Sequence, residues 1–383
     1  MKRIFEIDPW KVVTHEFKPE EKRLQESMTS IGNEYMGMRG MFEETYSGDT
    51  HKGIYLGGVW YPDKTRVGWW KNGYPEYFGK VINAVDFTKV DIKLNGSSVD
   101  LAKDEFSDFE LALDMKKGIL NRSFIVAKDG QKFRLNFERF VSVAQKELYA
   151  SKITVENLSD TEASVEIKSY IDADVFNEDA NYDEKFWYVL AQNVAETHMS
   201  LTAQTIPNNF GTPQFTTEML ADHVTDLRPM AAETTEKSVI NTFAGQIAAG
   251  QTVTFEKRVI VVTSRDHEKQ AALTQAAQTL SQKQAESSFE ELKAAQAAGW
   301  AKRWEKADVE ISGNAESQQG IRFNLFQLFS TYYGDDARLN IGPKGFTGEK
   351  YGGATYWDTE AFAVPLYLAL ADESVTKNLL KYR

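Results

Sequence analysis

The feature that most constrains the fold is an alternation of apolar and polar residues that recurs from about residue 80 to residue 265. In its clearest stretch the apolar residues are Val90, Ile92 and Leu94, separated by charged ones. This stretch ends at Asn95-Gly96, a pair typical of type I′ hairpin turns. Because successive side chains of a strand point to opposite faces, each stretch predicts a half-buried β-strand. Similar stretches recur at residues 109–115, 124–126, 133–137, 149–155, 165–171 and 253–255, and the continuous apolar run 259–262 is typical of a strand buried on both faces. Short strands joined by Asn-Gly and Asp-Gly turns predict an antiparallel β-sandwich over residues 1–266.

The pattern changes to that of helices after Asp266. Residues 267–298 contain no Gly or Pro and are rich in Ala, Gln, Lys and Glu, which favour helices. Ser287-Ser288 marks a break between two helices, and the second has an apolar stripe that includes Trp300 and Trp304. We expect a helical linker over residues 267–313 that packs on a larger body.

Residues 314–383 have a third pattern, in which helices are strongly apolar. A helix is predicted at 319–333, then a Gly-rich loop, then an apolar helix at 359–370 with Pro365 as a kink or first-turn residue. A further helix is predicted to begin near residue 372. Two or three such helices cannot close a core by themselves. We therefore expect either that the chain stops inside its third domain or that these helices pack on another chain.

Composition excludes several classes of function. The formal net charge of −12 argues against a nucleic-acid partner and against docking on an anionic membrane. No stretch reaches the roughly 18 apolar residues of a membrane span, and the N-terminus lacks the apolar run of a signal peptide, so a cytoplasmic protein is expected. The absence of cysteine excludes disulfides and thiolate chemistry, and the five histidines lack metal-ligand spacing. No metal site is predicted.

The segment 342–350 contains glycines and lysines, as a phosphate-binding loop does, but lacks the Gly-Lys-Ser/Thr ending of a nucleotide-binding P-loop. Two interpretations remain. The glycines allow the backbone to approach a small ligand closely, or the segment is a plain mobile loop.

The strongest candidate for chemistry is the run from Tyr356 to Glu360, which places aromatic rings and two carboxylates at the start of the apolar helix. One interpretation makes Asp358 a helix N-cap, favoured by the helix dipole. The other makes Trp357 and Asp358 a sugar-binding pair, in which the indole covers the ring and the carboxylate accepts bonds from two adjacent hydroxyls. Such charge-assisted hydrogen bonds contribute roughly 1.5–3 kcal/mol each. The residues alone leave both interpretations open.

Two segments resemble glycoside hydrolase family 65, which contains maltose, trehalose and kojibiose phosphorylases. The first runs from Ser30 to Glu44 and continues at 53–59, and it is similar to the N-terminal signature of the family. The second runs from Gly348 to Phe362 and is similar to the family's Gly-Glu-x-Tyr…Trp-Asp-Thr-Glu motif. The predicted order of sandwich, helical linker and helices agrees with that family, so the resemblance spans the whole chain.

The resemblance implies that residues 314–383 open an (α/α)₆ catalytic barrel. It also implies glycosyl transfer to phosphate with inversion: maltose and inorganic phosphate give glucose and β-glucose 1-phosphate. Members acting on maltose are the ones this sequence resembles most, with trehalose and kojibiose as alternative substrates. Phosphate is a substrate, so no cofactor is expected, and members are usually homodimers.

The same resemblance assigns roles to few residues of this chain. By position, Trp357 and Asp358 match those that hold the glucosyl ring, while the catalytic glutamate and the phosphate ligands are expected beyond Arg383. Glu360 is expected to point away from Asp358, and Glu349 receives no role. The first signature, around Asn33 and Arg39, is expected to be structural or to lie at a domain interface. If 383 residues were the whole polypeptide, a non-catalytic carbohydrate-binding or scaffold protein would be the better interpretation.

Overall fold

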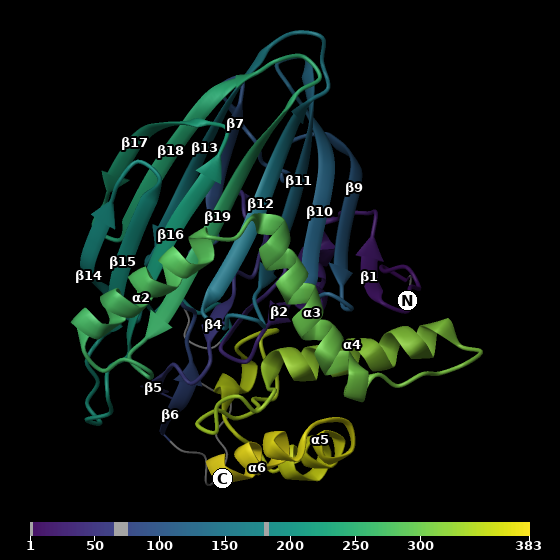
Figure 1. The fold of residues 1–383 in the computed structure, drawn as a ribbon, viewed down its shortest axis with the longest axis vertical. Coiled ribbons are helices and arrows are strands. Elements are labelled where there is room, and N and C mark those ends of the chain that lie inside the picture. Colours follow the sequence, from purple (N-terminus) through teal and green to yellow (C-terminus); the bar gives the residue numbers. More distant parts are fainter. Residues whose placement is uncertain (1–2, 65–75, 180–183) are drawn as a thin grey trace.

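The computed structural model describes residues 3–64, 76–179 and 184–383, and its largest feature is a pair of antiparallel sheets packed face to face (Figure 1). The larger sheet has the order β1-β9-β10-β11-β12-β19-β16-β15-β14, and the smaller has the order β17-β18-β13-β7-β8. The strands of the larger sheet are β1 (Lys11–Thr14), β9 (Phe106–Asp114), β10 (Ile119–Lys128), β11 (Gln131–Val141), β12 (Leu148–Asn157), β14 (Trp187–Val194), β15 (His198–Thr205), β16 (Thr216–Thr225) and β19 (Thr252–Thr263). Those of the smaller sheet are β7 (Val90–Leu94), β8 (Ser97–Ser98), β13 (Ala163–Asp172), β17 (Arg228–Thr234) and β18 (Ser238–Ile247).

The alternation in the sequence explains this sandwich. Along β13 every second residue is buried, and Ile167 pairs with Ile92 on one side and with Phe243 on the other. The turn after β7 has positive φ at both Asn95 (50°) and Gly96 (80°), as a type I′ turn requires. The predicted antiparallel sandwich is confirmed.

Two helices cover the outer face of the larger sheet (Figure 1). They are α2 (Gln270–Ala285), which buries Leu273 and Ala277 against strands β16 and β19, and α3 (Phe289–Ala307). The predicted break lies between them: the Ser288 hydroxyl accepts the Glu291 N–H, and the Glu291 carboxylate accepts the Ser288 N–H. The indole of Trp300 is fully buried and stacks on Phe326 of the next helix, with ring centroids 4.5 Å apart.

The helices that follow α3 lie below the sandwich in Figure 1, and two small sheets lie at the lower end of the sandwich. The predicted helix at 319–333 is α4 (Ala315–Thr331), and the apolar helix at 359–370 consists of a π-helical turn followed by α5, with Pro365 in the first turn. None of the helices in the three described stretches is long and apolar enough to cross a membrane. The other elements are η1 (Pro19–Glu21), α1 (Lys22–Met28), β2 (Ile31–Gly32), β3 (Met36–Met38), β4 (Ile54–Leu56), β5 (Trp60–Lys64), β6 (Tyr77–Val81), η2 (Lys350–Gly353), η3 (Thr359–Ala363), α5 (Val364–Leu370) and α6 (Glu373–Tyr382).

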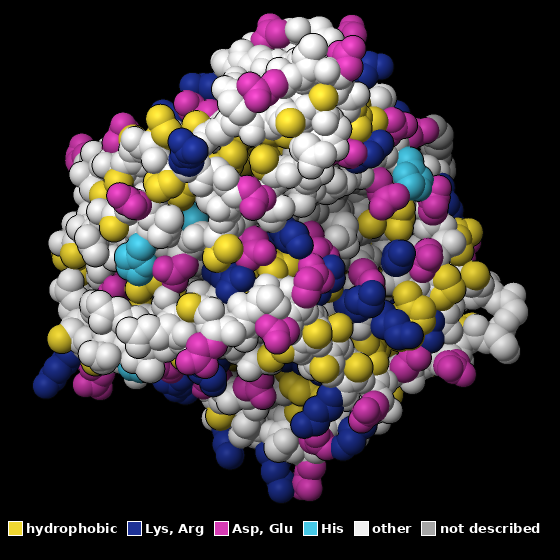
Figure 2. Space-filling view, turned by 45° about the horizontal axis from the view of Figure 1, so that its top comes forward, with side chains coloured by type: hydrophobic (Ala, Val, Ile, Leu, Met, Phe, Trp, Pro, Cys, Tyr) yellow, Lys and Arg dark blue, Asp and Glu magenta, His cyan; other side chains and the backbone are white. Residues whose placement is uncertain are grey.

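The surface carries charges of both signs. On the face drawn in Figure 2, Lys and Arg side chains are interspersed with Asp and Glu. Mixed charge of this kind is typical of a solvated surface.

The sandwich core contains a histidine that gives the fold a predictable pH dependence. His223 is buried; its Nδ1–H donates to Thr197 O (3.0 Å), and its Nε2 accepts the Ser169 hydroxyl (2.9 Å). Burial, together with the positive charge of Lys257, lowers the pKa of His223 to about 3. Below pH 6.5 the unfolded chain therefore binds a proton that the folded chain does not. The free energy of unfolding should fall by about 2 kcal/mol from this group between pH 7 and pH 5.

We expect His223→Gln to reduce this loss of stability in acid. The measurement is the difference between the urea concentrations at the midpoint of unfolding at pH 7 and at pH 5. His198→Gln is the matched control. His198 is partly exposed, and its hydrogen bond to Asp222 raises its pKa, so it contributes no acid lability. An unchanged difference between the two pH values in His223→Gln would show that His223 does not titrate as described.

Candidate functional site

The first sequence segment that resembles family members meets, in the folded chain, the loop that leads into the second segment about 300 residues later. The ring of Phe346 lies directly against the backbone of Gly32 and Gly37: a Cβ at these positions would stand 2.6 Å and 2.2 Å from ring atoms. Substitution by a larger residue would therefore displace the ring. The first segment is an interface between the sandwich and the loop that follows α4, as the sequence predicts for it.

Glu34 holds the start of this loop. Its backbone has φ = 75°, a left-handed conformation that is uncommon for a residue with a side chain. Its buried carboxylate accepts the backbone N–H groups of Tyr333, Asp335 and Asp336 at 2.9, 3.1 and 3.2 Å. Burial raises the pKa of Glu34 to about 6, while the three N–H donors oppose that rise. One side chain of the sandwich domain thus accepts three backbone N–H groups of the chain leaving α4.

Arg39 holds the middle of the same loop. Its guanidinium is buried and donates to His51 O (3.0 Å), to Arg23 O (2.7 Å) and, across the interface, to Thr347 O. The Glu26 carboxylate lies 3.7 Å from Arg39 Nη2 and compensates part of its charge. Arg39 therefore links three segments of backbone, at positions 23, 51 and 347, by hydrogen bonds.

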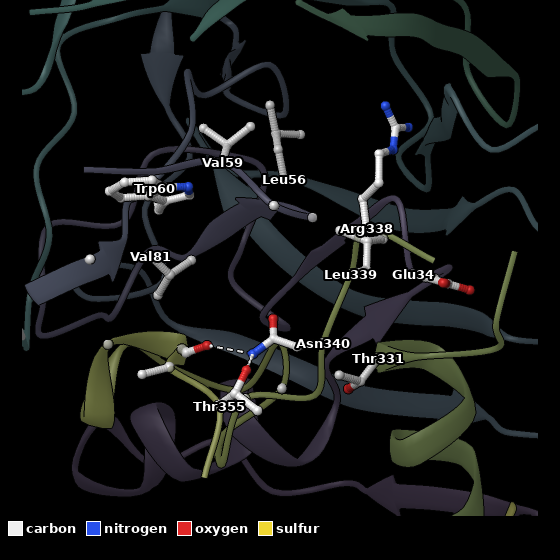
Figure 3. A pocket seen from close by; sticks show the side chains of 18 of the residues that line it. Glu34, Leu56, Val59, Trp60, Val81, Thr331, Arg338, Leu339, Asn340 and Thr355 are labelled. Atoms are coloured by element: carbon white, nitrogen blue, oxygen red, sulfur yellow. Dashed lines mark hydrogen bonds between the residues drawn. The ribbon is translucent and has the colours of Figure 1, made fainter. Parts of the chain in front are cut away.

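A cavity of about 730 Å³ lies between the small sheets and this loop, and Figure 3 shows it from close by. Leu56, Val59 and Val81 from β4 to β6 form an apolar wall. On the opposite side the Asn340 amide donates to Gly353 O (3.3 Å) and to the Thr355 hydroxyl. Cavities of this size with a few convergent polar groups are typical of small-molecule sites. Gly342, Gly345 and Phe346 of the Gly-rich segment line the cavity, so this segment is folded into the interface.

Trp357 and Asp358 lie outside this cavity, three and four residues after Ala354, which lines it. They stand at the start of the π-helical turn that leads into α5, and π turns are frequent at functional sites. Trp357 is 67% exposed, and its ring lies 6.0 Å from the equally exposed ring of Phe362. The structure places the two predicted residues side by side at the surface of this part of the chain.

The side chain of Asp358 does not act as an N-cap. Its backbone is already helical (φ −53°, ψ −30°), and its carboxylate accepts no capping N–H. An N-cap residue normally has extended dihedrals and accepts the N–H two or three residues ahead. The capping interpretation is therefore not supported, and the carboxylate is solvent-exposed.

The other two acidic residues of the motif are engaged elsewhere. Glu360 pairs with Arg383, with Oε2 2.9 Å from Nη2. Glu349 is completely buried against the sandwich. Within residues 3–64, 76–179 and 184–383, no group of three or more acidic or histidine side chains could hold a metal ion.

Comparison with known proteins decides the family. Residues 12–303 match the glycosyl hydrolase family 65 N-terminal domain, and residues 322–383 match the glycosyl hydrolase family 65 central catalytic domain. The chain belongs to glycoside hydrolase family 65. The predicted resemblance is thus confirmed over nearly the whole chain.

Several known proteins are similar along the entire chain or nearly all of it. Maltose phosphorylase of Bacillus subtilis (strain 168) is 51% identical over 382 residues, which cover 100% of this chain and 50% of that protein. Kojibiose phosphorylase of Escherichia coli (strain K12) is 30% identical over 363 residues, covering 93% and 45% respectively. A solved structure of a candidate kojibiose phosphorylase from the human microbiome superposes with a TM-score of 0.91 at 27% identity, covering 100% of this chain and 49% of that one. The chain spans about half the length of the curated relatives it matches.

The interface between the first family 65 motif and the loop before the second motif can be tested at Gly37. Gly37→Ala should lower the free energy of unfolding by about 1–3 kcal/mol, because the new Cβ would overlap the Phe346 ring. The cost should nearly vanish in a Phe346→Ala background, where the ring is absent. Urea unfolding followed by tryptophan fluorescence measures both.

The matched control is Gly320→Ala in α4, where an added Cβ meets nothing within 4 Å. This change should be neutral or slightly stabilising, because Ala favours helices more than Gly does. Equal costs of Gly37→Ala with and without the Phe346 ring would contradict the contact.

Proposed function

We propose that this chain forms the N-terminal part of a maltose phosphorylase. The proposed reaction is the phosphorolysis of maltose by inorganic phosphate, with inversion, to D-glucose and β-D-glucose 1-phosphate. The observation that carries the proposal is 51% identity to a maltose phosphorylase along the whole chain, against 27% and 30% for trehalose and kojibiose phosphorylases. We also propose a cytoplasmic homodimer that uses no cofactor.

The proposed domains are the sandwich at 1–266, the linker at 267–313 and the barrel opening at 314–383. The ends of the elements support this division. The last strand of the sandwich, β19, ends at Thr263, α2 begins at Gln270, and α4 begins at Ala315.

The proposed chemistry needs only one acidic group. An inverting hydrolase uses one carboxylic acid to protonate the leaving oxygen and a second carboxylate to activate water. Phosphate is already an anion and attacks the anomeric carbon without such a base. No carboxylate of this chain is assigned as the acid, because Glu360 is paired with Arg383 and Glu349 is buried. We assign that role to a glutamate outside this chain.

Trp357 and Asp358 are proposed to hold the glucosyl ring whose bond is cleaved. The exposed indole offers a flat apolar face for the C–H face of the sugar. The carboxylate of Asp358, which caps no helix, is available to accept hydrogen bonds from two adjacent hydroxyls.

The reaction class is tested by incubating the full-length polypeptide with maltose in the presence and absence of inorganic phosphate. We expect β-glucose 1-phosphate and glucose in equal amounts when phosphate is present, and no glucose without it. Trehalose and kojibiose, tested in parallel, should react at least tenfold more slowly. Glucose release that is indifferent to phosphate would indicate a hydrolase, and no turnover of any disaccharide would indicate a binding protein.

The site is tested by Asp358→Ala. This change should remove about two charge-assisted hydrogen bonds, roughly 3–6 kcal/mol, and lower kcat/KM on the order of 10² to 10⁴-fold. Asp358→Asn, which retains one acceptor oxygen, should lose less. Both variants should unfold at the wild-type temperature, because the carboxylate makes no capping bond. Near-normal kcat/KM in a folded Asp358→Ala protein would remove Asp358 from the site.

A further inference from the structure

Glu349 is a fully buried carboxylate that the proposed reaction does not use. It lies on the loop that ends at Trp357 and Asp358, yet its side chain points into the sandwich domain. Oε2 accepts the backbone N–H of Asp179 at 2.8 Å, and Oε1 accepts the Tyr55 hydroxyl at 3.4 Å. His51 Nε2 lies 3.5 Å from Oε1.

Stability alone does not explain a carboxylate in this place. Taking an ionised carboxylate out of water is costly, and apolar residues of similar volume often replace buried ion pairs without loss. The His51 ring is itself buried; among the described residues its Nε2 makes no hydrogen bond and faces Glu349 Oε1, while its Nδ1 lies 3.6 Å from Asp179 Oδ2. Glu349 and His51 therefore form a pair that is closed to solvent and joins the loop to the sandwich.

The backbone immediately after Glu349 is unusual. Tyr351, Gly352 and Gly353 have φ of 65°, 64° and 69°, so three consecutive residues are left-handed. Tyr351 adopts this conformation although it carries a side chain, and that side chain is 59% exposed. A strained backbone of this kind persists only where its surroundings impose it, and it clusters near functional sites.

Contacts on both sides impose this turn. Before it, Glu349 is anchored to the sandwich. After it, Gly352 and Gly353 pack on β6, where an added Cβ would stand 2.8 Å from Phe78 and 3.1 Å from Val81. The Asn340 amide then holds Gly353 O and the Thr355 hydroxyl, two residues before Trp357. The path from Glu349 to Trp357 is thus fixed at each step.

We propose that Glu349, with His51, is a positioning residue that sets the left-handed turn and so places Trp357 and Asp358 against the sugar. It does not touch substrate. This inference rests on the proposed function, since it acts through the residues assigned there to the glucosyl ring. It predicts that the effect of Glu349 on catalysis depends on Asp358.

A double-mutant cycle on the full-length protein, with maltose and inorganic phosphate, tests this dependence. Glu349→Leu keeps the volume and removes the acceptors, and kcat/KM should fall about 10 to 100-fold, as misplacement of a binding group by about 1 Å would cause. In the Asp358→Ala background the same change should cost less than about threefold. Glu349→Gln, which retains one acceptor oxygen, should restore most of the loss.

The matched control is Glu44→Gln. Glu44 is a buried carboxylate paired with Arg122 inside the sandwich domain, and none of its hydrogen bonds reaches the loop. Its change should lower stability without depending on Asp358. Should Glu349→Leu fail to fold, Tyr55→Phe removes one donor from the same carboxylate and should lower kcat/KM about two to fivefold, again only when Asp358 is present.

The outcomes separate the two proposals. If Asp358→Ala alone has near-normal activity, the proposed site fails. A second outcome is that Asp358→Ala lowers kcat/KM as expected. If the double variant then loses kcat/KM by the product of the two single losses, Glu349 acts independently of Asp358 and the positioning role is overturned. A folded Glu349→Leu or Tyr55→Phe protein with wild-type kcat/KM overturns it as well.

Discussion

The carboxylate of Glu34 accepts three backbone N–H groups from the turn that follows α4, and the conformation of the loop toward Trp357 depends on this contact. The three donors lie in a partly buried turn, and each hydrogen bond to a charged carboxylate contributes roughly 1.5–3 kcal/mol. One side chain therefore satisfies a turn that has no regular secondary structure of its own. Arg265, which pairs with Asp336, and Asn378, whose amide donates to Gly334 O, hold the same turn from other sides.

The other contacts of the interface extend this constraint along the loop. Arg39 binds the backbone at Thr347, Phe346 fills the space left by Gly32 and Gly37, and Glu349 enters the sandwich domain. Each contact joins a residue of the N-terminal signature, or its neighbour, to the loop before α5. This explains in physical terms why both motifs occur in one chain: the first supports the conformation of the second. The sandwich domain is then part of the structure that presents Trp357, although it lies far from it in sequence.

The sequence predicted those parts of the fold that depend on local pattern. The alternation at 90–94 and the Asn95-Gly96 turn led to the correct strand and hairpin, because side-chain direction and turn geometry are local properties. The sequence likewise predicts the break at Ser287-Ser288, because a solvated helix ends there and a helix with an apolar stripe begins. The sequence also predicts the helix that begins near Thr359, because the residues that follow are strongly apolar.

Local sequence patterns do not predict the arrangement of the site. The left-handed backbone of Glu34 contradicts the local preference of glutamate and exists because the tertiary contact with 333–336 favours it. The cavity is lined by residues from distant parts of the chain, near positions 34, 57, 80, 215, 265, 340 and 382, and no spacing rule connects them. The sequence gives no role to Glu349, because its burial against His51 and Tyr55 exists only in the folded chain.

Hydrogen–deuterium exchange at the amides of Asp335 and Asp336 tests the central claim, that the sandwich domain fixes this loop through Glu34, most directly. In the wild-type protein these amides should exchange slowly, as buried strand amides such as that of Ile167 do. In Glu34→Ala they should exchange at least about tenfold faster while Ile167 is unchanged. Fast exchange in the wild type, or slow exchange that survives the loss of the carboxylate, would contradict the account.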